Sequence, residues 1–131
     1  MLDVAFADKN GPKVGGIYAN GMQISVYKLV REVKPAEVPK LKKEVSNVVK
    51  QIMASLPGAK IDQSLEGLTV NGVPGFGFGY SYVQDDMKLK GVSFFLFKGQ
   101  YEYQLTAQAA SKDWETLKGK LEAAFQTFTI K

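Results

Sequence analysis

The spacing of apolar residues changes period along the chain and predicts strands, a long helix, more strands and a second helix. Residues 22–30 alternate between apolar and polar, with Met22, Ile24 and Val26 on one side. Alternation of this kind is typical of a strand with one buried face. We therefore expect a strand over residues 22–30 that packs on a core through these three side chains.

Two shorter apolar segments precede that strand. Residues 4–7 form a short apolar piece, and residues 14–18 read as another strand. Asn20-Gly21 follows directly and accepts the positive φ that a type I′ turn requires. We therefore predict a hairpin between residues 14–18 and 22–30.

Between residues 35 and 56 the apolar positions recur at steps of three and four, which predicts an amphipathic helix. Pro39 fits only in a first turn, so the helix should begin near residues 36–38. Pro57-Gly58 should end it, since glycine suits a left-handed cap. The expected buried stripe consists of Val38, Leu41, Val45, Val48, Val49, Ile52, Met53 and Leu56.

Residues 59–110 return to a period of two and predict an antiparallel meander. Its expected strands cover residues 60–70 (bent at Gly67), 75–82, 90–98 and 101–107. Its expected turns are Asn71-Gly72, Gln84-Asp85-Asp86-Met87 and Lys98-Gly99-Gln100.

Two strands of the meander carry unusual patterns. In residues 75–82 glycines alternate with aromatics, so one face is bare and the other is aromatic. No helix follows directly, so the glycines indicate close helix packing on that face rather than a phosphate loop. Residues 90–98 are apolar on both faces and predict a central strand that is buried on both sides.

A second helix should begin where Ser111 or Asp113 can cap it. Its expected buried stripe consists of Trp114, Leu117, Leu121, Ala124, Phe125 and Phe128. We find no linker, low-complexity tract or repeat. The sequence therefore predicts one α+β domain, in which an antiparallel sheet of five to six strands packs with two helices.

Composition narrows the possible chemistry. The 131 residues include no Cys and no His. Disulfides, thiolate nucleophiles, Cys or His metal ligands and Ser-His-Asp catalysis are therefore excluded. We see no membrane-spanning run and no signal peptide, and we expect no metal site and no cofactor.

The positive charge is concentrated in one part of the chain. The net charge is +4, but residues 28–60 alone carry eight of the 17 Lys and Arg and three of the 13 Asp and Glu. One interpretation is a docking patch for an acidic partner, an anionic lipid surface or nucleic acid; the other is the solvated face of an amphipathic helix. The candidate partner-binding residues are Arg31, Lys40, Lys42, Lys43 and Lys50. No nucleic-acid-binding motif accompanies them, so we expect no nucleic-acid partner.

A second candidate surface is aromatic. If the sheet were covered on only one face, Tyr80, Tyr82, Tyr101 and Tyr103 would form an exposed platform. Otherwise the aromatic residues belong to the core.

Three segments together carry a family resemblance. They are "VNGVPGFGFGYSY" (residues 70–82), "GVSFFLFKGQYEYQLTAQA" (residues 91–109) and "W..L...LEAAFQTF" (residues 114–128). In this order the chain resembles the PsbP-like superfamily. That superfamily includes the extrinsic photosystem II protein, bacterial lipoprotein relatives and the Mog-type Ran-binding import factor. The resemblance covers about residues 22–128 and rests on positions that support a fold.

The resemblance implies a single PsbP-like domain over residues 1–131 with a binding or assembly role. Only residues 4–6 could represent the family's usual opening segment, so its N-terminal hairpin would be missing. Metal-binding histidines known in some photosynthetic members have no counterpart here.

Three functions stay open at this point. We expect a non-enzymatic domain that docks a protein. The alternative is a small-molecule or lipid binder with a cleft between sheet and helix, and an enzyme ranks last. Localisation depends on the full gene product: the cell envelope if a leader has been removed, and otherwise the cytoplasm.

Overall fold

The computed structural model describes residues 2–7, 11–14 and 17–129. Its strands are β1 (Leu2–Ala7), β2 (Lys13–Val14), β3 (Ile17–Tyr18), β4 (Gly21–Val33), β5 (Lys60–Val70), β6 (Val73–Gln84) and β7 (Met87–Ala110). Its helices are the 3₁₀ helix η1 (Pro35–Leu41), α1 (Lys42–Ser55) and α2 (Ser111–Gln126).

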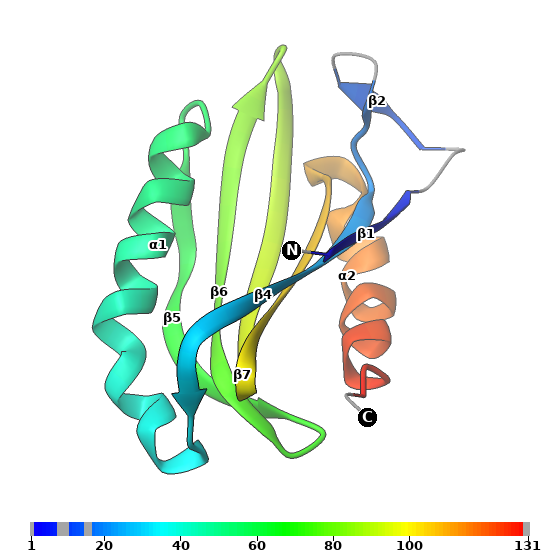
Figure 1. Ribbon diagram of the computed structural model, residues 1–131. Coiled ribbons are helices and arrows are strands. Elements are labelled where there is room, and N and C mark those ends of the chain that lie inside the picture. Colours follow the sequence, from blue (N-terminus) through cyan, green and yellow to red (C-terminus); the bar gives the residue numbers. More distant parts are fainter. Residues whose placement is uncertain (1, 8–10, 15–16, 130–131) are drawn as a thin grey trace.

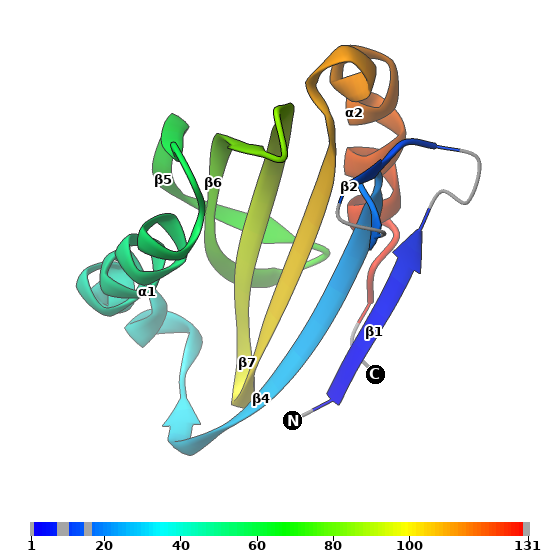
Figure 2. The ribbon, with the colours of Figure 1, turned by 90° about the horizontal axis from the view of Figure 1, so that it is seen from above.

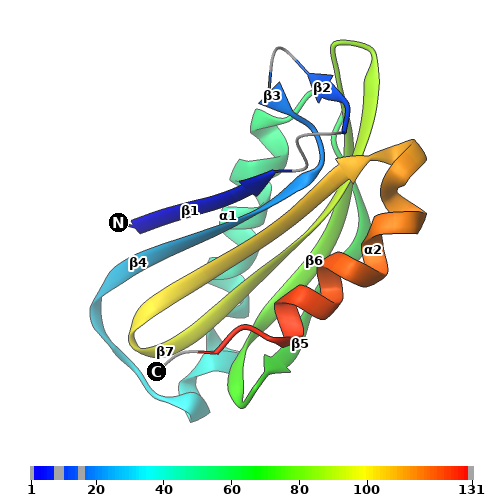
Figure 3. The same cartoon turned by 90° about the vertical axis from the view of Figure 1, so that its right-hand side faces the viewer.

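The main sheet is antiparallel and has the strand order β1-β4-β7-β6-β5. The long strand β7 folds back on itself at Gly99, whose φ is +62°, and Figure 3 shows its two arms meeting in this turn. The arms lie side by side, because Ser93 Oγ is 2.9 Å from Thr106 Oγ1. The first arm pairs with β6 and the second with β4, so β7 lies at the centre of the sheet.

The two long helices lie on opposite faces of this sheet (Figures 1 and 2). The α1-side cluster contains the buried residues Ala19, Val33, Val38, Val45, Val49, Phe76, Phe78, Tyr80, Tyr82, Leu89, Phe95 and Phe97. The α2-side cluster contains Val70, Val73, Val92, Leu96, Leu105, Ala107, Ala109, Trp114 and Phe125. The α+β class, the antiparallel sheet with two helices and the central strand buried on both faces are therefore confirmed.

The predicted turns of the meander are also confirmed. Asn71 and Gly72 have φ of 50° and 81°, as a type I′ turn requires. Asp85 and Asp86, with φ of 49° and 64°, connect β6 to β7 in the same way. These turns form where the residues themselves tolerate a left-handed backbone.

The predicted hairpin at Asn20-Gly21 is wrong. Strand β3 pairs with β2 in a separate two-stranded sheet, while β4 pairs with β1 and β7. The Asn20 side chain instead accepts a hydrogen bond from the Ala110 N–H at 2.8 Å and donates one to Asp113 Oδ2 at 3.1 Å. Asn20 thus accepts the backbone N–H of Ala110 at the start of α2, although it lies in a distant part of the chain. Neither Ser111 nor Asp113 caps that helix as predicted.

The first helix begins later than predicted. Residues 35–41 form η1, and α1 begins only at Lys42. Pro39 lies inside η1, where it lacks the N–H that an α-helical bond would use. The predicted end is confirmed: α1 stops at Ser55, and Gly58 has a φ of +60°.

The glycines of β6 have a different role from the one predicted. Side chains of Leu68 and Phe94 fill the space beside Gly77, and Gln63 covers Gly79, so no helix packs closely there. A Cβ at Gly75 would overlap the carbonyl oxygen of Phe95. Strand β5 is irregular near Gln63, where its pairing with β6 shifts, rather than at the predicted Gly67.

Within the described residues, no helix is long and apolar enough to cross a membrane.

Candidate functional site

An apolar cleft opens at the corner where α1, the end of β4 and the turn of β7 meet. It has a volume of about 280 Å³. Its lining residues are Leu29, Val30, Arg31, Val33, Leu41, Glu44, Val45, Val48, Phe97 and Glu102. The cleft therefore lies between helix and sheet, at one end of the α1-side cluster.

The walls of the cleft follow from the helical stripe and from an irregularity in β4. Val45 and Val48 of α1 and Phe97 of β7 all line it. The pairing of β4 with β7 shifts between Lys28 and Val33, which is the mark of a bulge. Val30 lies in this irregular part and is fully exposed, so an apolar side chain stands in water beside an apolar cleft.

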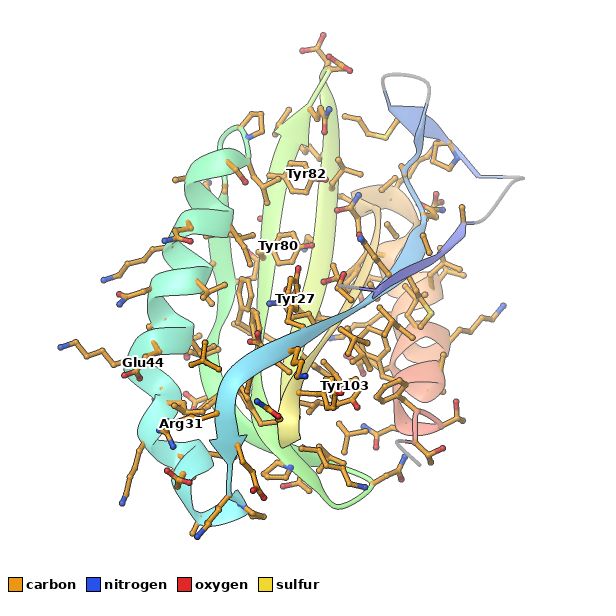
Figure 4. The ribbon with its side chains drawn as sticks, viewed as in Figure 1. Tyr27, Arg31, Glu44, Tyr80, Tyr82 and Tyr103 are labelled. Atoms are coloured by element: carbon orange, nitrogen blue, oxygen red, sulfur yellow. The ribbon has the colours of Figure 1, made fainter. Side chains whose placement is uncertain are left out.

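Arg31 lines the cleft, but its charge is engaged elsewhere. Its guanidinium donates to Glu37 Oε2 at 3.1 Å, and Glu37 Oε1 accepts the Lys34 backbone N–H at 3.1 Å. The Lys34 N–H, and after it the Arg31 guanidinium, hold the pKa of Glu37 below its usual range. Figure 4 shows Arg31 on β4 and Glu44 on α1 at the same end of the molecule.

Two carboxylates line the cleft as well. Glu44 is exposed on α1, whereas Glu102 is half-buried on β7, where its backbone pairs with that of Tyr27 on β4. Burial raises the pKa of Glu102, and a hydrogen bond from Gln104 partly offsets this. Within the described residues neither carboxylate forms an ion pair. Among the described residues, Glu102 is thus a half-buried acid with no ion-pair partner.

The predicted basic residues are all exposed, but they do not form one compact group. Lys40 in η1 and Lys42 and Lys43 in α1 are neighbours in sequence of the lining residues Leu41 and Glu44, but none of the three lines the cleft itself. Lys50 follows about two helical turns later along α1, farther from the cleft. Their role in partner binding stays a prediction.

The predicted tyrosine platform is wrong, because the four side chains lie on opposite faces of the sheet. Tyr80 and Tyr82 are 4% and 6% exposed and belong to the α1-side cluster (Figure 4). Burial raises the pKa of Tyr80, and the Tyr82 hydroxyl donates to Gln108 Oε1 at 2.8 Å. Tyr101 is exposed, while Tyr103 packs on the α2 side with its ring centroid 6.0 Å from that of Phe128.

A second, more polar hollow lies on the α2 side, between β5, β6 and α2. It has a volume of about 700 Å³, and its walls include Asp62, Glu66 and Glu122. In the part of the chain that the structure describes, no group of three or more acidic residues is arranged to hold a metal ion. Ser81 and Ser64 hydroxyls instead donate to Asp62 and Glu66.

Sequence reasoning missed Val30 and Glu102. The adjacent apolar pair Leu29-Val30 interrupts the alternation of β4, and this interruption is a signal for a bulge. Glu102 alternates with Tyr101 and Tyr103 as a surface residue would, so its burial follows only from the packing of the cleft.

Comparison with solved structures identifies the class of fold. The chain is similar to a protein of unknown function from Pseudomonas aeruginosa, PA94, with a TM-score of 0.69 and 15% identity over 99% of this chain and 83% of that one. Cyanobacterial PsbP from Synechocystis matches with a TM-score of 0.65 and 10% identity over 98% and 82%. LpqN, involved in cell envelope biogenesis of Mycobacterium tuberculosis, matches with a TM-score of 0.59 and 15% identity over 97% and 82%.

These likenesses establish a PsbP-like fold, as the sequence resemblance implied. No protein-family model and no curated protein sequence matches the chain.

Proposed function

We propose that the chain is a non-enzymatic domain that binds a protein partner at the α1–β4 corner. The observation that carries this proposal is the fully exposed Val30 beside an apolar cleft. An exposed apolar side chain that continues into an apolar depression is typical of a docking site. The PsbP-like fold of the chain is compatible with a domain of this kind.

The charge around the cleft supports an acidic partner. Lys40, Lys42 and Lys43 adjoin the lining residues Leu41 and Glu44 in the sequence, and all three are exposed. A partner with carboxylates opposite these lysines would associate faster at low salt, because such rim charges mainly steer the encounter.

A small apolar molecule or lipid is the second candidate, because the walls of the cleft are largely Val, Leu and Phe. Its volume, about 280 Å³, lies just below the range of ligand pockets, which span roughly 300–1,000 Å³. The cleft suits one side chain of a partner better than a lipid tail.

The test is photo-crosslinking from position 30. A chain with a benzophenone amino acid in place of Val30 is irradiated in a lysate of its source organism, and the matched control carries that amino acid in place of Val83, an exposed valine at the end of β6. We expect one protein adduct from position 30 that position 83 does not give. Adducts that are equal at both positions would contradict the proposal, and a lipid adduct would favour the second candidate.

The basic rim is tested on the same adduct. Lys40, Lys42 and Lys43 are replaced together by Glu, and the control replaces Lys112, Lys118 and Lys120 of α2. We expect the first set to abolish the adduct at low salt and the second to leave it. If both sets act alike, the chain's net charge rather than this surface governs binding.

A further inference from the structure

We infer that the cleft accepts a lysine side chain of the partner, with its aliphatic stem against Val45, Val48 and Phe97 and its ammonium beside Glu102. This inference rests on the proposed function, because it names the anchor of the same docking site. The partner would then carry one basic residue at the centre of a contact surface that is otherwise acidic.

The shape of the cleft fits such a side chain. Its volume of about 280 Å³ holds one long, unbranched side chain rather than a folded segment. The walls are aliphatic and aromatic, and long basic side chains bury their methylene stems along apolar surface of this kind while the charged head finds a polar group.

The charges in the lining point to a cation. Arg31 is the one basic residue of the lining, and its guanidinium is 3.1 Å from Glu37, outside the lining set. Glu44 and Glu102 remain, and within the described residues neither forms an ion pair. A half-buried carboxylate gains most from an ionised donor, since charge-assisted hydrogen bonds are stronger than neutral ones and are screened less where water is excluded.

Glu102 is held where it can receive such a donor. Its backbone is paired with that of Tyr27 on β4, so the strand fixes its position on the sheet. Burial raises the pKa of its carboxyl. An ammonium beside it would lower that pKa, so binding and ionisation would support each other.

The surroundings of the cleft have the opposite sign. Lys40, Lys42 and Lys43 adjoin its lining residues in the sequence and are exposed, as is one acid, Glu32, so basic residues outnumber acidic ones among these neighbours. A partner that complements both parts has acidic residues around a single lysine. Such an inversion of charge fixes the register of docking, because a shifted partner would place like charges together.

The probe is a blocked peptide with one central lysine between two glutamates on each side, and the matched probe carries norleucine in place of lysine. Norleucine keeps the stem and removes the ammonium, which makes the second peptide more negative. Binding is followed by amide chemical shifts of Val45, Val48 and Phe97. We expect the lysine peptide to bind about tenfold more tightly.

The opposite order overturns the inference. If general attraction to the basic rim dominated, the more negative norleucine peptide would bind at least as tightly, and the proposed docking function would stand without a basic anchor. If neither peptide shifts these amides, the inference also fails, and the crosslinking experiment decides the docking function separately.

Glu102→Gln tests whether the carboxylate of Glu102 is the group that meets the lysine ammonium. We expect it to remove the preference for lysine over norleucine, while Glu66→Gln, an exposed acid on β5, keeps the preference. A preference that persists in Glu102→Gln would show that the ammonium does not meet Glu102 and would overturn the assignment.

Discussion

Glu102 connects the cleft at the α1–β4 corner to the stability of the fold. Its carboxyl is half-buried on a strand of the sheet, and burial raises its pKa above the usual 4.5. The folded state therefore binds the proton more tightly than the unfolded state does, and ionisation of Glu102 costs stability. A residue that weakens the free protein in this way is typical of a site whose partner supplies the missing interaction.

The corresponding prediction is that Glu102→Gln stabilises the free protein at neutral pH. The cost of ionising Glu102 begins as the pH rises above 4.5, its unfolded pKa, and is complete above the raised folded pKa. Gln avoids this cost, so the gain in melting temperature should be absent near pH 4 and constant at neutral pH. Thermal melting between about pH 3 and pH 8 measures it. A variant that is less stable than the parent at neutral pH would contradict this account.

At the scale of elements, the sequence predicts turns that depend only on the turn residues, but not which distant strands pair. Asn71-Gly72 makes its turn because these two residues accept positive φ wherever they stand. Asn20-Gly21 carries the same signal, yet β3 and β4 pair with other strands and Asn20 bonds Ala110, 90 positions away. The Asn-Gly pair alone does not show that β3 and β4 pair with other strands, because that pairing depends on residues elsewhere in the chain.

The same reasoning covers the candidate site. The α1 stripe was predictable from its period, and it supplies the Val45 and Val48 wall of the cleft. The alternation of residues 101–103 assigned side chains to faces but not to burial, so Tyr103 and Glu102 were not placed correctly. Which face a helix covers is decided by packing between distant elements.

Two glycines of the chain should respond oppositely to alanine. In β6, Gly75→Ala places a Cβ on the Phe95 carbonyl, and backbone has to move, so we expect a loss of at least about 1–3 kcal/mol. In α2, Gly119→Ala meets nothing within 4 Å, and alanine favours the helix by roughly 0.8–1.0 kcal/mol. Urea unfolding of both variants gives the two values. If Gly75→Ala left the free energy of unfolding unchanged, β6 and β7 would be able to move apart without a loss of stability.

At the scale of the whole molecule, the central sheet links the stability of the two core clusters. Each helix packs on its own side, and the two clusters share no residue. Both clusters nevertheless use side chains of β6 and β7, for example Phe95 on one face and Leu96 on the other. Loss of one cluster would therefore expose strands on which the other depends, and we expect one cooperative unfolding transition.

Trp114 makes this coupling measurable, because it is the single tryptophan and belongs to the α2-side cluster. Val49→Ala removes two methyl groups from the α1-side cluster and should destabilise the protein by about 1–2 kcal/mol. The Trp114 fluorescence transition in urea should move by the same amount as the far-ultraviolet circular dichroism transition, although Val49 lies on the other face. The exposed residue Lys50→Ala serves as the control and should leave both transitions within about 0.5 kcal/mol. If the dichroism transition moved alone, α1 would unfold separately, and the α1–β4 corner could open without loss of the rest of the fold.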